Sequence, residues 1–259
     1  MTTRDRAPVG APCWADLWTS DVQGSRRFYP QLFGWEAQEP SPEFGGYFMF
    51  TRNGAPVAGG MGDMPGAPAQ DLWKVYLATD DIDRVLKGTE ARGGQVLAPA
   101  MPVADLGVQA VINDPTGAHL GAWQPKQFPG FSVLDEPGTP NWFELMTRDH
   151  DTAIDFYQSV FGWETHSVGD SDDFRYTVMR DPGTGSWLAG VMDASKFLPE
   201  GTPSFWSVYW EAEDVDAVVS RALQLGGSVP QPAEDTPYGR LAGLTDPAGA
   251  RFKLRSSVR

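Results

Sequence analysis

The chain has 259 residues, 41% of them hydrophobic, which is enough to bury the core of one large domain or of two ordinary ones. Its formal net charge of −14 would repel phosphate backbones and anionic lipid, so nucleic acids and membrane surfaces are excluded as expected partners. No stretch is apolar over the roughly 18 residues that a membrane span needs, and the first residues lack the apolar core of a secretory signal, so a cytoplasmic protein is expected.

The first predicted elements make one βαβββ module. Asp21 is a suitable N-cap for a helical pattern, and Asn53-Gly54 is a dipeptide that favours the two-residue turn of a hairpin. The periodicities predict a strand, a helix and then strands over residues 13–19, 22–33, 46–52 and 55–61.

A second module follows directly. Gly93-Gly94 ends its helix, and the turn sequence Asp114-Pro115-Thr116-Gly117 closes its last hairpin. Its predicted strand, helix and three further strands cover residues 73–79, 82–92, 95–98, 109–113 and 119–124.

The second half of the chain repeats the first. The segment GAPCWADL at 10–17 recurs as GTPNWFEL at 138–145, and Phe33-Gly34-Trp35 recurs as Phe161-Gly162-Trp163. The sequence therefore predicts an α+β protein of four βαβββ modules. The expected parts are a first domain, a Pro- and Gly-containing linker and a second domain, over residues 1–126, 127–137 and 138–259.

This ordered set of motifs, present twice, resembles the vicinal-oxygen-chelate superfamily of glyoxalases, bleomycin-resistance proteins and dioxygenases. The motifs are a first strand, a helix with Phe-Tyr, then Phe-Gly-Trp, Gly-Gly and a closing Asp-Pro-x-Gly hairpin. The resemblance covers nearly the whole chain and is greatest to tandem glyoxalase-like proteins of actinobacteria, some described as hydroxylases near aromatic polyketide pathways. It implies that two modules pack edge to edge, so that their sheets curl into a ligand-binding cup.

The same resemblance implies where metal ligands would stand. Family members that bind a metal hold it by His, Gln or Glu side chains on the first and fourth strands of each module. Here those positions carry side chains that bind divalent ions poorly or not at all. They are Trp14, Trp142, Gly121, Lys253, Lys74, Ser207, Gly190 and either Gly59 or Gly60. We therefore expect neither a metal ion nor another cofactor.

Strand alternation from these positions predicts which side chains line the two cups. Aromatic rings with a few polar tips suit a hydrophobic or aromatic small molecule. Alternatively, the side chains fill the cups themselves. The predicted linings are Trp14, Asp16, Trp18, Lys74, Tyr76, His119 and Trp123 in the first cup, and Trp142, Glu144, Met146, Ser207, Tyr209, Glu211, Arg251 and Lys253 in the second.

Asp16 and its repeat partner Glu144 are the candidate catalytic groups. A carboxylate among aromatic rings needs a cation, hydrogen-bond donors or a raised pKa. The candidate partners are Lys74 in the first cup and Lys253 or Arg251 in the second, with Tyr76 or Tyr209 as the donor that steadies an enolate. The alternative is that each carboxylate only fixes strand geometry.

Two functions remain open at this stage. One is a metal-independent, glyoxalase-like tailoring enzyme of secondary metabolism that transfers protons on a hydrophobic or aromatic natural product. The other is a protein that sequesters such a compound without changing it. His119 and three tryptophans favour the first domain as the ligand site, and the expected oligomeric state is a monomer or a homodimer.

Overall fold

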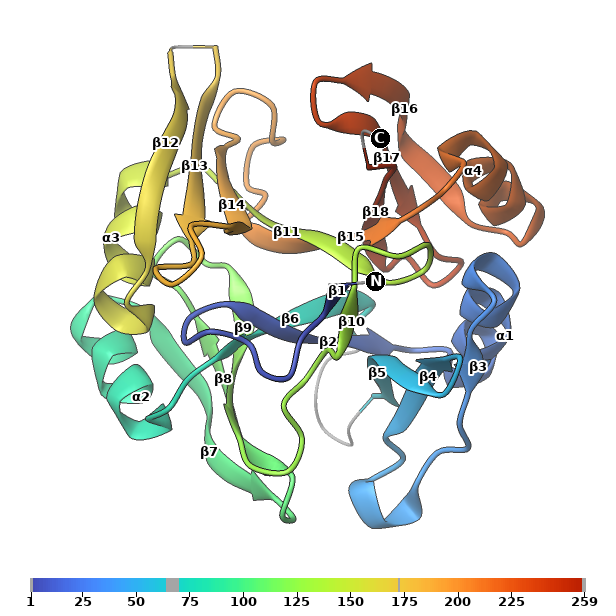
Figure 1. The fold of residues 1–259 in the computed structure, drawn as a ribbon, viewed down its shortest axis with the longest axis horizontal. Helices are drawn as coiled ribbons and strands as arrows, with labels where there is room; N and C mark the ends of the chain where they lie inside the picture. Colours follow the sequence, from blue (N-terminus) through green and yellow to red (C-terminus); the bar gives the residue numbers. More distant parts are fainter. Residues whose placement is uncertain (1, 64–69, 172, 258–259) are drawn as a thin grey trace.

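Two eight-stranded mixed sheets with two helices each form the protein, as Figure 1 shows. The computed structural model describes residues 2–63, 70–171 and 173–257. The predicted α+β fold of four βαβββ modules in two tandem domains is confirmed. None of the helices in the described ranges is long and apolar enough to cross a membrane.

The first sheet comes from the first half of the chain, with the strand order β3-β4-β5-β2-β6-β9-β8-β7. Its modules consist of β2 (Pro12–Thr19), α1 (Val22–Phe33), β3 (Glu36–Ala37), β4 (Phe48–Arg52) and β5 (Ala55–Gly62), and then of β6 (Leu72–Ala78), α2 (Ile82–Ala91), β7 (Gln95–Val103), β8 (Gly107–Asn113) and β9 (His119–Pro125). A short 3₁₀ helix, η1 (Pro42–Phe44), precedes β4.

The second sheet repeats this arrangement with the order β12-β13-β14-β11-β15-β18-β17-β16. Its modules consist of β11 (Pro140–Thr147), α3 (His150–Phe161), β12 (Glu164–Asp170), β13 (Arg175–Arg180) and β14 (Trp187–Asp193), and then of β15 (Phe205–Glu211), α4 (Val215–Gln224), β16 (Ser228–Thr236), β17 (Gly239–Thr245) and β18 (Arg251–Arg255). Two short strands outside both sheets, β1 (Thr2–Thr3) and β10 (Val133–Leu134), pair with each other.

The helices begin and end where their capping residues predict. The Asp21 carboxylate accepts a hydrogen bond from the backbone N–H of Gly24 at 2.8 Å, and Gly34 ends α1 with a φ of 70°. Helix α2 ends one residue before the predicted Arg92. Strand β7 is longer than predicted because, with two bulges, it stays paired with β8 as far as Val103.

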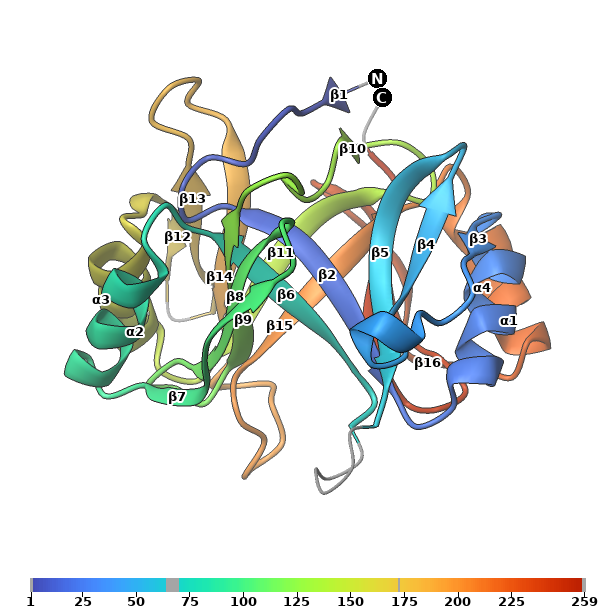
Figure 2. The ribbon, with the colours of Figure 1, turned by 90° about the horizontal axis from the view of Figure 1, so that it is seen from below.

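The hydrophobic core lies between the two sheets and belongs to both domains. The rings of Trp73 on β6 and Trp210 on β15 lie 5.1 Å apart, and Trp35 contacts Trp210 at 4.9 Å. Helix α1 lies beside α4 and α2 beside α3, as the views in Figures 1 and 2 agree. Side chains on a strand point alternately to its two faces. The residues next to the core positions along each strand therefore face away from the core, into the two cups.

Two reciprocal hydrogen bonds join the domains inside this core. The Tyr29 hydroxyl donates to Asp246 at 3.0 Å, and the Tyr157 hydroxyl donates to Asp114 at 2.9 Å. Each aspartate also accepts backbone N–H bonds in the turn that closes its last hairpin. Each Asp-Pro-x-Gly turn therefore reverses the chain and also accepts a hydrogen bond from a tyrosine of the other domain.

The segment between the domains is packed rather than extended. The Phe131 N–H donates to the carbonyl of Cys13 at 2.8 Å, and its ring contacts both Trp14 and Phe143. The ring of Phe128 lies edge-on to Trp14 at 4.8 Å. The predicted linker thus contributes side chains to the first cup.

We predict that Tyr29→Phe lowers the free energy of unfolding by about 1–3 kcal/mol, because it leaves a buried carboxylate oxygen and the buried indole N–H of Trp73 without their shared partner. Urea denaturation measures the loss. Tyr238→Phe is the control, since Tyr238 is 41% exposed, and should change stability by less than about 0.5 kcal/mol. Equal effects of the two substitutions would contradict the assigned role of the buried pair.

Candidate functional site

The second cup is built around Glu144 in the middle of β11. Its Oε1 accepts a hydrogen bond from the Tyr176 hydroxyl at 3.0 Å, and its Oε2 accepts one from the Tyr209 hydroxyl at 2.6 Å. Lys253 Nζ lies 2.8 Å from Glu144 Oε2 and also donates to the Tyr209 oxygen at 2.8 Å. The indole N–H of Trp142 completes the network by donating to Tyr176 at 2.9 Å. Both predicted partners, Tyr209 and Lys253, therefore meet the carboxylate.

The electrostatics of this network keep Glu144 ionised. Burial raises the pKa of Glu144, but the charge of Lys253 and the hydrogen bonds from Lys253, Tyr209 and Tyr176 outweigh burial, and the pKa lies below its ordinary value. Burial and the charge of Glu144 raise the pKa of both tyrosines well above 10. The floor of the cup thus holds a compact ion pair that the neutral phenol of Tyr209 bridges, with a second neutral phenol, Tyr176, donating to the carboxylate.

A glycine makes room for this arrangement. Gly190 on β14 pairs with Glu144 in the parallel ladder, and a Cβ there would lie 1.9 Å from the Tyr176 hydroxyl oxygen. Gly190 is one of the positions where metal-binding members of the resembled family place a ligand. Here its missing side chain gives space to a tyrosine that reaches across from β13.

A cavity of about 1030 Å³ opens above this floor. Three of the most exposed large hydrophobic side chains of the protein stand at it: Trp187, Phe197 and Tyr238. Further lining residues include Trp142, Met146, Phe174, Tyr176, Leu198, Phe205, Ser207, Tyr209, Leu241 and Lys253. Aromatic walls over a small polar floor form the kind of site that takes an organic ligand of drug-like size.

Two predicted members of the second cup have other surroundings. Arg251 lines the cavity but is exposed and does not pair with Glu144. Glu211 accepts hydrogen bonds from the backbone N–H of Ser257 at 3.0 Å and from its hydroxyl at 2.7 Å, and also binds the Asn141 amide. Glu211 therefore ties the end of β15 to the C-terminal residues and is not among the cavity's lining.

The first cup repeats the carboxylate centre. Asp16 Oδ1 accepts hydrogen bonds from the indole N–H of Trp14 and from the Tyr47 hydroxyl, both at 2.8 Å. Gly59 pairs with Asp16 across the ladder, and a Cβ there would lie 1.9 Å from the Tyr47 oxygen. The Tyr76 hydroxyl also lies close enough to lower the pKa of Asp16, although burial dominates and raises it.

The cation of the first cup is placed differently. Lys74 forms neither an ion pair nor a hydrogen bond with any residue that the structure describes; its Nζ lies 3.9 Å from the centre of the Trp18 ring. Burial lowers the pKa of Lys74 to about 8, although the charge of Asp16 opposes the change. Burial and the charge of Lys74 lower the pKa of His119 to about 4. Lys74, the candidate partner of Asp16, therefore acts on Asp16 through its charge and forms no ion pair with it among the described residues.

Side chains occupy much of the first cup. Phe128 contacts the rings of Trp14 and Trp123, and its carbonyl accepts a hydrogen bond from the Trp123 indole at 2.9 Å. Gly121 allows the Tyr76 ring to lie against β9, since a Cβ there would meet that ring at 2.1 Å. The large cavity thus lies in the second domain, whereas the sequence favoured the first.

Two residues of these centres were not predicted, namely Tyr47 and Tyr176. They occupy corresponding places in the two halves of the chain. Tyr47 directly precedes β4, and Tyr176 is the second residue of β13. Aligning the repeats through this region shows the pair, and its recurrence opposite the two carboxylates is the signal that could have identified it.

The donor sets do not fit a divalent metal ion. Among residues 2–63, 70–171 and 173–257 no three His, Cys, Asp or Glu side chains come together in a way that could hold one. The floor of each cup holds one carboxylate, Asp16 or Glu144, and an ammonium group already binds Glu144.

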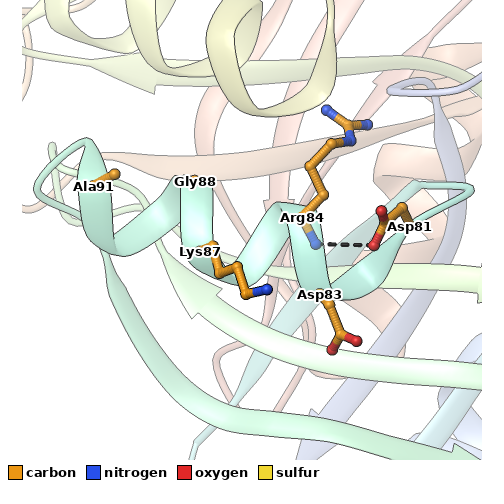
Figure 3. Close-up of a pocket in the computed structure, with 6 residues that line it drawn as sticks. All are labelled: Asp81, Asp83, Arg84, Lys87, Gly88 and Ala91. Carbon is orange, nitrogen blue, oxygen red and sulfur yellow. Dashed lines mark hydrogen bonds between the residues drawn. The ribbon is translucent and has the colours of Figure 1, made fainter.

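A second hollow runs along α2 and shares no lining residue with the cavity above Glu144; Figure 3 shows the residues that line it. Its charged residues belong to the first turns of the helix, where Asp81 accepts a hydrogen bond from the Arg84 N–H at 2.9 Å. This is helix capping with acidic charge favoured by the helix dipole, and we assign it no chemistry.

We predict that Gly190→Ala displaces Tyr176 and destabilises the protein by about 1–3 kcal/mol, because the added methyl group overlaps the hydroxyl. Thermal or urea denaturation measures the loss. Gly183→Ala is the matched control in an exposed turn, where the nearest atom would be 3.3 Å away. Wild-type stability of Gly190→Ala would refute the close fit of tyrosine to glycine.

We predict that the two carboxylates have opposite effects on stability. The pKa of Glu144 is lowered by folding, so its contribution is present above the unfolded pKa and is lost as pH falls through the folded value. Glu144→Gln should therefore cost about 2–4 kcal/mol at about pH 7 and less at about pH 4.

The pKa of Asp16 is raised, so ionisation opposes folding as pH rises. Asp16→Asn should leave stability at neutral pH unchanged or increased. Urea denaturation at the two pH values tests both substitutions, and losses of the same sign and size at neutral pH would contradict the distinction.

Comparisons with known proteins agree with this architecture. Residues 13–120 and 139–254 each match the Glyoxalase/Bleomycin resistance protein/Dioxygenase superfamily. CFP32 of Mycobacterium tuberculosis is 37% identical over 262 residues, covering 98% of this chain and 97% of that protein. The anthracycline biosynthesis protein DnrV of Streptomyces peucetius is 38% identical over 267 residues, covering 96% and 94%.

Among solved structures, the Mn(II)-bound glyoxalase of Novosphingobium aromaticivorans has the same fold, with a TM-score of 0.65 at 15% identity, covering 97% of this chain and 83% of that one. The repeated βαβββ modules, the paired cups and the two family matches lead to one conclusion. The chain belongs to the glyoxalase/bleomycin resistance protein/dioxygenase superfamily and carries two domains of that family in tandem.

Proposed function

We propose that this protein is a glyoxalase-like enzyme of secondary metabolism that binds a hydrophobic or aromatic natural product in its second cup and transfers a proton on it without a metal ion. The observation that carries the proposal is the cavity of about 1030 Å³, with aromatic walls over the Glu144–Tyr209–Lys253 floor.

The walls suit a ligand with flat rings. Phe174 and Tyr176 lie stacked with their centroids 5.8 Å apart, and the indole N–H of Trp142 donates to the Tyr176 hydroxyl from β11, two strands away. Burying apolar rings against such side chains contributes about 25 cal/mol per Å² of apolar surface. A ligand of several fused rings would therefore obtain most of its affinity from these walls, and its orientation from the polar floor.

The floor can stabilise negative charge on a ligand oxygen. Lys253 Nζ donates to Glu144 and to Tyr209, and its third N–H faces only the Met146 Sδ at 3.9 Å. A thioether is a weak acceptor, so a ligand carbonyl or phenol oxygen can replace it. A donor fixed in this way stabilises an enolate or phenolate as it forms. The released proton can pass to the Tyr209 oxygen while Tyr209 gives its own proton to Glu144, 2.6 Å away.

The relatives named for anthracycline biosynthesis support a natural-product ligand. They share about 37% identity with this chain over nearly its whole length, so the matched region includes the strands that form both cups.

The second candidate is sequestration without chemistry. Its support is the environment of Glu144, whose oxygens accept hydrogen bonds from two tyrosines and a lysine. A carboxylate held in this way, with its pKa lowered, is a weak base.

The test is turnover of polycyclic aromatic polyketides, followed by mass spectrometry and by exchange of acidic C–H protons in deuterated buffer. We expect Lys253→Met and Glu144→Gln to lower kcat/KM by about 100-fold or more while changing ligand affinity far less. Lys126→Met is the control, because Lys126 is exposed outside the cup. Tight binding with no product or exchange would favour sequestration, and full activity of both variants would contradict the assigned roles.

A further inference from the structure

Lys74 is the most deeply buried charged side chain near either cup, with 2% of its surface exposed. It stands opposite Asp16 across the antiparallel ladder of β2 and β6. On its other side the parallel register of β6 and β9 pairs Tyr76 with Gly121, which places His119 level with Lys74. One row of three adjacent strands thus carries an acid, a lysine and a histidine.

Polar atoms at this end of the first cup lack partners. Within the described part of the chain, neither Trp18 Nε1 nor His119 Nε2 has a hydrogen-bond partner, and both atoms are buried. Lys74 Nζ lies over the Trp18 ring at 3.9 Å and makes no hydrogen bond there. The three groups come from three neighbouring strands: β2, β6 and β9.

These atoms have a common requirement. An ammonium and an indole N–H can only donate, so both need an acceptor. His119 Nδ1 contacts Asn113 Oδ1 at 3.2 Å; if the Asn113 amide is turned, Nε2 can carry the proton and donate as well. A buried cation without a counter-ion in contact costs free energy, and an acceptor with negative charge would remove that cost.

Asp16 does not meet this requirement. Its Oδ1 already accepts hydrogen bonds from Trp14 and Tyr47, and it forms no ion pair with Lys74. Burial raises its pKa, so its own negative charge is not favoured in this place.

We propose that the first cup holds a second binding site, in which Lys74, Trp18 and His119 bind the oxyanion of a small organic molecule, a carboxylate or a phenolate. The molecule is small because Phe128, Trp14 and Trp123 pack together in the same cup. The second cup lacks this site, since Ser207 and Arg251 stand in the corresponding row. The proposal concerns a different cup from the proposed function and does not depend on it.

The test uses benzoate as the anionic probe and benzamide as its neutral counterpart of the same shape, with isothermal titration calorimetry on the full chain. We expect benzoate to bind saturably at a site that Lys74→Met removes, and benzamide to bind at that site at least about 10-fold more weakly. Lys74→Met, and separately Trp18→Phe, which keeps a ring but removes the N–H donor, should each weaken benzoate binding by about 10-fold or more.

Lys126→Met is the matched control, because Lys126 is exposed outside the cups, and it should leave benzoate affinity unchanged. The absence of saturable benzoate binding, equal affinity for benzamide, or loss of binding in Lys126→Met but not in Trp18→Phe would overturn the proposal. If Lys74→Met fails to fold, Trp18→Phe and the benzamide comparison decide the question. Turnover of polyketides in the second cup is measured separately, so failure of one proposal does not affect the other.

Discussion

A carboxylate buried in the middle of a central strand is the constraint on which both cups depend. An ionised or partly ionised acid among aromatic rings is tolerated only when donors surround it. In each domain a tyrosine from beyond the neighbouring strand donates to the acid, as Tyr47 does to Asp16 and Tyr176 to Glu144. The indole two residues before the acid donates to that tyrosine, and in the first domain also to the acid itself. The tyrosine can reach the acid only because the facing residue, Gly59 or Gly190, has no side chain. At or next to these positions, metal-binding members of the family place a metal ligand. Here the two glycines leave room for the tyrosine that hydrogen-bonds the acid.

The two cups diverge at the position of one lysine. In the second domain Lys253 on β18 contacts Glu144 directly, and the resulting compact ion pair forms the floor of an open cavity. In the first domain the corresponding position on β9 is Gly121, the Tyr76 ring fills the space, and the lysine stands on β6 instead. Phe128 then packs into the same cup from the segment between the domains. One duplicated frame therefore carries an open cavity with aromatic walls in the second domain, and a first cup in which Phe128 packs against Trp14 and Trp123.

Much of the frame could be predicted from the sequence because its signals are local or repeated. Asp21 and Gly34 fix the ends of α1, and strand alternation from Trp14 and Trp142 places Asp16 and Glu144 toward the cups. The bonding of the acids was only partly predictable. Lys253 meets Glu144 because β18 lies next to β15, whereas Lys74, directly opposite Asp16, turns toward Trp18. Such a choice depends on how side chains pack across three strands. Local sequence patterns also could not show which cup contains the open cavity. That depends on where Phe128 and the segment carrying Phe197 pack in the folded protein.

A crystal structure with a polycyclic aromatic quinone bound tests the central claim most directly, because it locates the ligand and its polar contacts together. The account predicts electron density for the rings in the second cup, against Trp142 and Phe174, with a ligand oxygen within hydrogen-bonding distance of Lys253 Nζ. Density for the ligand only outside this cup, or a second cup closed by its own side chains, would contradict it.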